Sequence, residues 1–78
     1  MSEYEKYIIA YSLTNAFVDK INGNIHSATN TLVKLLDIIH SWQTDNSNNE
    51  VAYNHLQNII NEIDSLIEEC RMKVGDKS

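Results

Sequence analysis

The sequence predicts an all-α protein of three helices, with the second and third as an antiparallel hairpin and the first packed across it in a small bundle. Three observations predict this fold. Proline is absent and glycine occurs only at 23 and 75, so few positions interrupt a helix. Two Ser-x-x-Glu sequences have capping-box spacing, and two long apolar seams alternate in steps of three and four. At 78 residues, the chain is predicted to be a single helical domain, residues 1–78.

The first helix is expected over residues 3–22. Ser2 and Glu5 have the spacing at which a hydroxyl and a carboxylate each satisfy a free backbone N–H at a helix start. Asn22-Gly23 then supplies a residue that can adopt the left-handed conformation found at helix ends. One glycine without a proline is compatible with either a bend or a full reversal, and the sequence leaves that choice open.

The second helix is expected over residues 25–43 and carries the first apolar seam. The residues that recur on one helical face are Ile25, Ala28, Leu32, Leu35, Ile39 and Trp42. Six turn-forming residues follow at 44–49, and their side chains compete with the backbone for hydrogen bonds. This segment is predicted to be a loop.

The third helix is expected over residues 48–74, starting at a second capping box, Ser47 to Glu50, and ending at Gly75. Its seam is the most regular in the chain: Tyr53, Leu56, Ile60, Ile63, Ile67, Cys70 and Val74. Two seams joined by a short loop favour an antiparallel hairpin.

The first helix differs from the other two because apolar residues surround about two-thirds of its circumference when projected at about 100° per residue. An ordinary surface helix has a narrower apolar stripe. Either this helix lies in a groove between the other two, or another chain covers part of it. A homodimer that shares the first helix is compatible with the second alternative and would supplement a small core.

Charge and cysteine content restrict the class of protein. Six basic against eleven acidic residues give a net charge of −5, which opposes direct binding to nucleic acid. The single cysteine, Cys70, excludes an internal disulfide and suits a reducing compartment. No run approaches the roughly 20 apolar residues of a membrane span, so we expect a cytoplasmic protein without a membrane partner.

The sequence shows no pattern of residues that indicates catalysis, a metal or a cofactor. The three histidines, His26, His40 and His55, do not share a zinc-type spacing and are expected at the surface or at a seam edge. Cys70 occupies a seam position, where a thiol is expected to pack as a small hydrophobe. Two isolated glycines cannot form a phosphate-binding or nucleophile-elbow motif. We therefore expect a protein that is not an enzyme.

Two groups of residues are candidates for partner binding. The first is the aromatic group of the first helix, Tyr4, Tyr7, Tyr11 and Phe17, since tyrosine is enriched at interface hot spots. Tyrosines also cover the cores of small bundles, and the two interpretations are almost evenly balanced. The second is the acidic side of the third helix, which is either a solvated face or a surface that steers a basic partner: Glu62, Asp64, Glu68 and Glu69.

Small size, acidity and the missing catalytic groups lead to one main functional hypothesis. The chain is expected to be a protein-binding regulator or inhibitor of the immunity, antitoxin-like or phage counter-defence type. The first alternative is a self-assembling structural or chaperone-like helical subunit. The second is a transcription-associated factor that acts through a DNA-binding partner.

Overall fold

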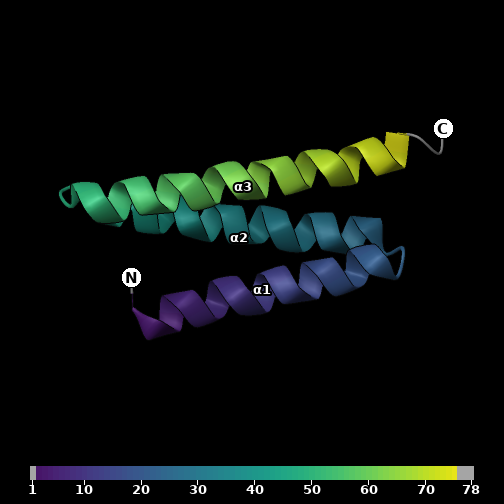
Figure 1. The fold of residues 1–78 in the computed structure, drawn as a ribbon, viewed down its shortest axis with the longest axis horizontal. Coiled ribbons are helices and arrows are strands. Elements are labelled where there is room, and N and C mark those ends of the chain that lie inside the picture. The colour runs from purple at the N-terminus through teal and green to yellow at the C-terminus, as the bar shows by residue number, and fades with distance from the viewer. Residues whose placement is uncertain (1, 76–78) are drawn as a thin grey trace.

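The structure of the chain is a computed structural model that describes residues 2–75, which form three helices. They are α1 (Glu3–Ile21), α2 (Ile25–Asp45) and α3 (Glu50–Gly75). Each helix runs antiparallel to the one before it, and together they measure 45 × 20 × 14 Å (Figure 1). The predicted all-α fold and the antiparallel hairpin of α2 and α3 are confirmed.

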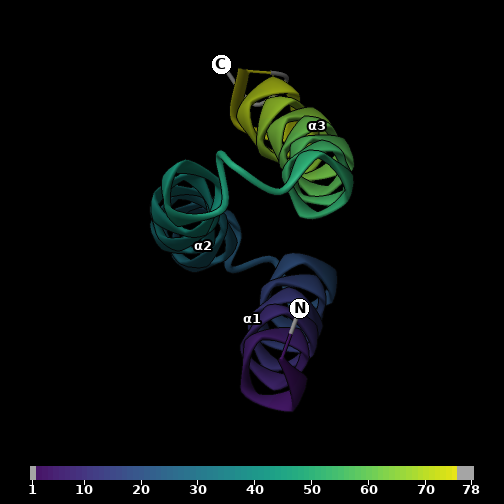
Figure 2. The same cartoon turned by 90° about the vertical axis from the view of Figure 1, so that its left-hand side faces the viewer.

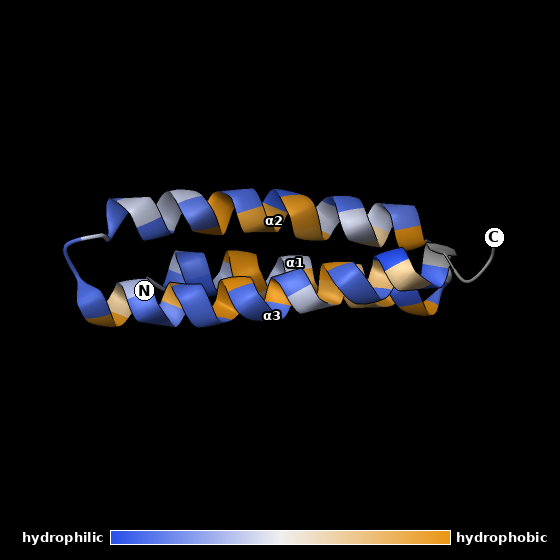
Figure 3. Ribbon diagram, turned by 90° about the horizontal axis from the view of Figure 1, so that it is seen from above, coloured by the Kyte–Doolittle hydropathy of each residue, from blue (hydrophilic) through white to orange (hydrophobic). Residues whose placement is uncertain are grey.

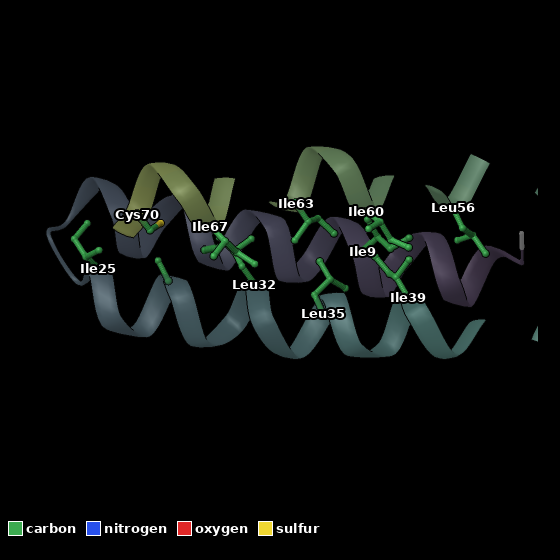
Figure 4. Close-up of a cluster of buried hydrophobic side chains, with 12 residues drawn as sticks. Ile9, Ile25, Leu32, Leu35, Ile39, Leu56, Ile60, Ile63, Ile67 and Cys70 are labelled. Carbon is green, nitrogen blue, oxygen red and sulfur yellow. The ribbon is translucent and has the colours of Figure 1, made fainter. Parts of the chain in front are cut away.

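The core lies mainly between α2 and α3, along the two predicted seams. Figure 4 shows the labelled side chains of these helices pointing toward one another. The buried apolar residues are Ile25, Ala28, Leu32, Leu35 and Ile39 of α2, and Leu56, Ile60, Ile63, Ile67 and Cys70 of α3. Each of these ten was predicted as a seam residue, so the three-and-four spacing identified the packed faces correctly.

The seams differ from the prediction near the loop that joins α2 and α3. Trp42 is only half-buried, and Gln43 occupies the buried position instead. On α3, Tyr53 is 39% exposed and the buried seam starts at Leu56. The side chain of Val74, the last predicted seam residue, lies outside the described part of the chain. The hairpin core is therefore shorter at the loop end than the apolar pattern indicates.

The position of α1 is more specific than the sequence indicates. Viewed end-on, α1 and α3 both lie on the same side of α2, one below and one above, so the three helices form an open V with α2 at its apex (Figure 2). Ile9 and Ala16 are the residues of α1 that are buried, with Ile8 and Leu13 partly buried against the same core. Most of α1 packs along α2 alone. The rest of its circumference remains exposed.

The chain reverses fully between α1 and α2, which answers the question that the sequence leaves open. Gly23 has a φ of +85°, the left-handed conformation that costs a glycine little. The Asn24 N–H donates to the Asp19 carbonyl at 2.8 Å and the Gly23 N–H donates to the Lys20 carbonyl at 3.2 Å. These bonds close the last turn of α1 as the chain turns back.

The turn between α2 and α3 corrects two predictions. Helix α2 continues two residues beyond the predicted end at 43, to Asp45, and at its end the Asn46 side-chain amide donates to the Trp42 carbonyl at 2.8 Å. Helix α3 starts at Glu50, and its cap is Asn49, whose Oδ1 accepts from the Ala52 N–H at 3.2 Å. The predicted capping box at Ser47 is therefore wrong. The first predicted box, at Ser2 and Glu5, is confirmed.

Candidate protein-binding surface

The side of α1 that faces away from α2 carries a continuous apolar stripe. Its positions are spaced alternately by three and four residues, the same spacing as the buried seams of α2 and α3. All of them are exposed, from 49% for Val18 to 83% for Ile21 among the apolar members. We call this stripe the outward seam: Tyr4, Tyr7, Tyr11, Thr14, Val18 and Ile21.

The outward seam lies opposite the buried side of α1. At about 100° per residue, its members cluster about 180° from Ile9 and Ala16, which pack against the hairpin. A helix with seams on two opposite sides has little net amphipathicity, which accounts for the wide apolar arc in the sequence. Figure 3 shows hydrophobic residues recurring along α1 as well as along the hairpin helices.

Two tyrosines of the outward seam are already in contact. The rings of Tyr7 and Tyr11 stack with centroids 5.8 Å apart and an interplanar angle of 23°. This distance is within the range of favourable aromatic pairs, so the two rings restrict each other's rotamers. A surface whose side chains are ordered before binding loses less entropy when a partner covers it.

The Thr14 hydroxyl in the middle of the outward seam has a partner of its own. It donates to the Ala10 carbonyl of the preceding turn at 2.8 Å. The cost of burying a hydroxyl comes mostly from a lost hydrogen bond, and this bond would survive under a partner. Burying Thr14 beneath a partner should therefore cost little free energy.

Phe17, the fourth predicted aromatic anchor, does not lie on the outward seam. It is 45% exposed and lines a small groove where α1, α2 and α3 meet. Leu13, Ala16, Lys20, Leu32, Leu66 and Cys70 line the rest of this groove. The predicted aromatic group is therefore divided between two surfaces.

The charged residues of α1 lie mostly away from the outward seam. The Glu5 carboxylate accepts from the Ser2 N–H at 2.9 Å, and this hydrogen bond to the backbone lowers the pKa of Glu5. Lys20 donates to Glu69 of α3 at 2.8 Å, and Asp19 accepts from the Ser27 hydroxyl at 2.8 Å. The charged side chains of Glu5, Asp19 and Lys20 therefore bond within this chain. None of them belongs to the outward seam, whose own residues are uncharged.

The four predicted acidic residues of α3 are all exposed, but they do not form one cluster. Glu62 and Glu69 are seven residues apart and share one flank of the helix, whereas Asp64 and Glu68 share the other. Hydrogen bonding to Lys20 lowers the pKa of Glu69 and holds it as a carboxylate within an intramolecular ion pair. Glu69 is therefore less available to a partner than the other three.

Cys70 and the histidines occupy structural or solvated positions. Cys70 is 1% exposed and belongs to the hydrophobic core, as its seam position predicts. His26, His40 and His55 are exposed, as expected. Among residues 2–75, no three His, Cys, Asp or Glu side chains are grouped so that they could hold a metal ion.

Sequence reasoning found the three tyrosines but missed the rest of the outward seam. Thr14 is polar, and Val18 and Ile21 belong to the apolar arc that covers about two-thirds of the helix circumference. The signal was present in the sequence: the spacing 4, 7, 11, 14, 18, 21 is a heptad pattern independent of the buried one.

In the part of the chain that the structure describes, no helix has the length and apolar character needed to cross a membrane. Comparisons of this chain with protein-family models, with curated proteins and with solved structures found no match.

Proposed function

We propose that this chain is a small protein-binding regulator or inhibitor that acts by contact through the outward seam of α1 and not by catalysis. The observation that carries the proposal is the exposure of Tyr4, Tyr7 and Tyr11, at 70%, 61% and 56%. Monomeric proteins rarely leave a long contiguous apolar stripe in water, and such stripes mark protein–protein contact sites. A cytoplasmic role of the immunity, antitoxin-like or counter-defence type fits the chain's size and acidity.

The acidic flanks of α3 have a secondary role in this proposal. Glu62, Asp64 and Glu68 are exposed and lie on a different helix from the outward seam. Toward a target protein with a basic surface, their charge raises the association rate, and salt reduces this effect; toward a second copy of the same acidic chain, their charge acts in the opposite direction. The contact energy itself comes from the tyrosines, because buried aromatic side chains dominate interface energetics.

The test is the double variant Tyr7→Ala/Tyr11→Ala. Both side chains are mostly exposed, so the circular dichroism melt should remain nearly unchanged while capture of the partner protein from the native host is lost. The matched control is Val51→Ala on α3, a residue that is 80% exposed but lies outside the outward seam, and it should retain capture. A collapse of the melt in the double variant would show that the tyrosines stabilise the fold, and would refute this assignment.

A further inference from the structure

We propose that the outward seam of α1 pairs with the same seam of a second copy of this chain, with the two α1 helices antiparallel. This inference depends on the proposed function, because it names the occupant of the same surface. Four observations support it: the spacing of the seam residues, the lack of charge on the seam, the order of its side-chain sizes, and the hydrogen bond that already satisfies the Thr14 hydroxyl at its centre.

The spacing selects a helix as the occupant. Residues that alternate by three and four form a narrow stripe that winds slowly around a helix, and the surface that fits such a stripe is the matching stripe of another helix. The seam runs from Tyr4 to Ile21, almost the full length of α1, which is about 28 Å at 1.5 Å per residue. The occupant is therefore a helix of similar length with an apolar seam of its own.

The charge distribution selects a partner that is also uncharged at the contact. Beside the seam, the positions that usually carry Glu or Lys in coiled coils are Ile8, Asn15 and Asn22 on one flank. Glu3, Ala10 and Phe17 occupy the other flank. Within residues 3–22, Glu3 is the one charged residue next to the seam, on a chain of net charge −5. A second copy can therefore approach this face without bringing like charges together.

The order of side-chain sizes selects the direction of pairing. The large residues Tyr4, Tyr7 and Tyr11 occupy the first half of the seam, and the smaller Thr14, Val18 and Ile21 occupy the second half. An antiparallel pair centred between Tyr11 and Thr14 places each tyrosine opposite a smaller residue. Tyr4 then faces Ile21, Tyr7 faces Val18 and Tyr11 faces Thr14. Alternating large and small residues is how helical layers fill space, whereas a parallel pair would stack tyrosine on tyrosine.

The middle of the seam is suited to burial at the two-fold axis. Thr14 lies there with its hydroxyl already bonded to the Ala10 carbonyl, so the partner copy need not satisfy it. Antiparallel alignment also places the positive end of one helix dipole beside the negative end of the other. One pair of short helices is a small contact compared with standard interfaces, so the dimer should dissociate on dilution.

The first experiment is sedimentation equilibrium of the full chain over micromolar to millimolar concentrations. The expected result is a reversible monomer–dimer equilibrium that added salt strengthens, because the contact itself is uncharged and salt screens the repulsion between two chains of net charge −5. Val18→Glu should raise the dissociation constant at least about tenfold, since two carboxylates would be buried against tyrosines. Asn58→Glu adds the same charge to the exposed side of α3 and should leave the equilibrium unchanged.

The second experiment uses cross-linking to determine the direction of pairing and does not depend on how Val18→Glu folds. Single variants Tyr4→Cys and Ile21→Cys replace exposed residues, and the native Cys70 is buried at 1% exposure. Oxidising an equal mixture should give a disulfide-linked dimer of one variant with the other, and little linkage of either variant with itself. Dimers of Tyr4→Cys linked to itself would overturn the antiparallel arrangement.

The outcomes also separate this inference from the proposed function. A chain that remains monomeric at every concentration overturns self-pairing. If that monomer still loses partner capture in Tyr7→Ala/Tyr11→Ala, the outward seam binds a different protein and only the inference fails. If the monomer also captures nothing through the seam, both the inference and the proposed function fail.

Discussion

The Nζ of Lys20 on α1 lies 2.8 Å from Oε2 of Glu69 on α3, and this ion pair links the first and third helices directly. Glu69 is an exposed residue within α3, so its contribution to the stability of the fold comes from this ion pair. The bond raises the pKa of Lys20 and lowers the pKa of Glu69. The Glu69 side chain is 57% exposed and the Lys20 side chain 21%, and an ion pair with an exposed partner stabilises a fold only weakly because solvent screens it.

The pH dependence of this pair follows from the two pKa directions. Because the folded pKa of Glu69 is below its ordinary value of 4.5, the stabilisation is present above that value and is lost as pH falls through the folded pKa. Because the folded pKa of Lys20 is above 10.5, the lysine's share is present below 10.5 and is lost only as pH rises further. The contribution should therefore be constant around neutral pH and disappear in acid.

Lys20→Met tests the ion pair while keeping an unbranched side chain against Leu66 and Cys70 in the groove. At neutral pH and low salt, the variant should melt slightly below the wild type, and amide exchange in the last turn of α1 should be faster. The difference should vanish in acid, where Glu69 is protonated. The control is Lys34→Met at an exposed site on α2. An unchanged difference in acid would contradict the assignment.

Gln43 is a buried polar residue, and its hydrogen bonds connect α2 to α3 near the loop. Its Nε2 donates to Gln57 Oε1 at 2.8 Å and to the Tyr53 carbonyl at 3.4 Å. Gln43→Ala should lower the free energy of unfolding by about 1–3 kcal/mol, because polar groups of α3 lose their partner. A urea-denaturation cycle with Gln57→Ala should give a coupling energy of at least about 0.5 kcal/mol. Strictly additive effects would show that the contact is not energetically significant.

Gly23 should be sensitive to substitution because of its backbone conformation and not because of crowding. A Cβ built there meets no atom within 4 Å, but the φ of +85° is unfavourable for L-residues. Gly23→Ala should destabilise the fold by about 1–2 kcal/mol, and Gly23→Asn by less, since asparagine tolerates this conformation better. Urea denaturation measures both values. Equal stability of the alanine variant and wild type would mean that the chain does not make this turn.

The Cys70 thiol should resist modification until the helices separate. It is 1% exposed and lies in the core that α2 and α3 share. Labelling by a thiol reagent should be at least about 100-fold slower in the folded chain than in urea, because a buried thiol is unreactive. Fast labelling of the folded chain would mean that the end of the hairpin near the Gly23 turn opens readily.

The sequence predicted buried residues and helix caps correctly where a single physical cause determined them. The seams of α2 and α3 predicted all ten buried apolar residues of the hairpin, because burial against one neighbour imposes a single period, but they did not predict the buried Gln43. The box at Ser2 and Glu5 was predicted because both partners are local. The start of α3 was predicted wrongly because Ser47 and Asn49 are both good caps, and local spacing alone does not choose between them.

The candidate site was only partly predictable for a related reason. Helix α1 has two seams on opposite sides, and a sequence projection cannot tell which of them packs on α2. The burial of Ile9 and Ala16 settles that question and shows the tyrosines to be exposed. The Lys20–Glu69 contact joins residues 49 positions apart, so no local pattern contains it. Phe17 was grouped with the tyrosines by residue type, although it faces the groove.

Hydroxyl-radical footprinting tests the central claim, that the outward seam of α1 is a protein-binding surface, most directly. The oxidation of each tyrosine is measured in cells that naturally make the chain and in the dilute purified chain. Tyr53 on α3, 39% exposed, is an internal reference outside the seam. The account predicts that Tyr4, Tyr7 and Tyr11 lose oxidation relative to Tyr53 in cells. Equal ratios in the two samples would contradict it.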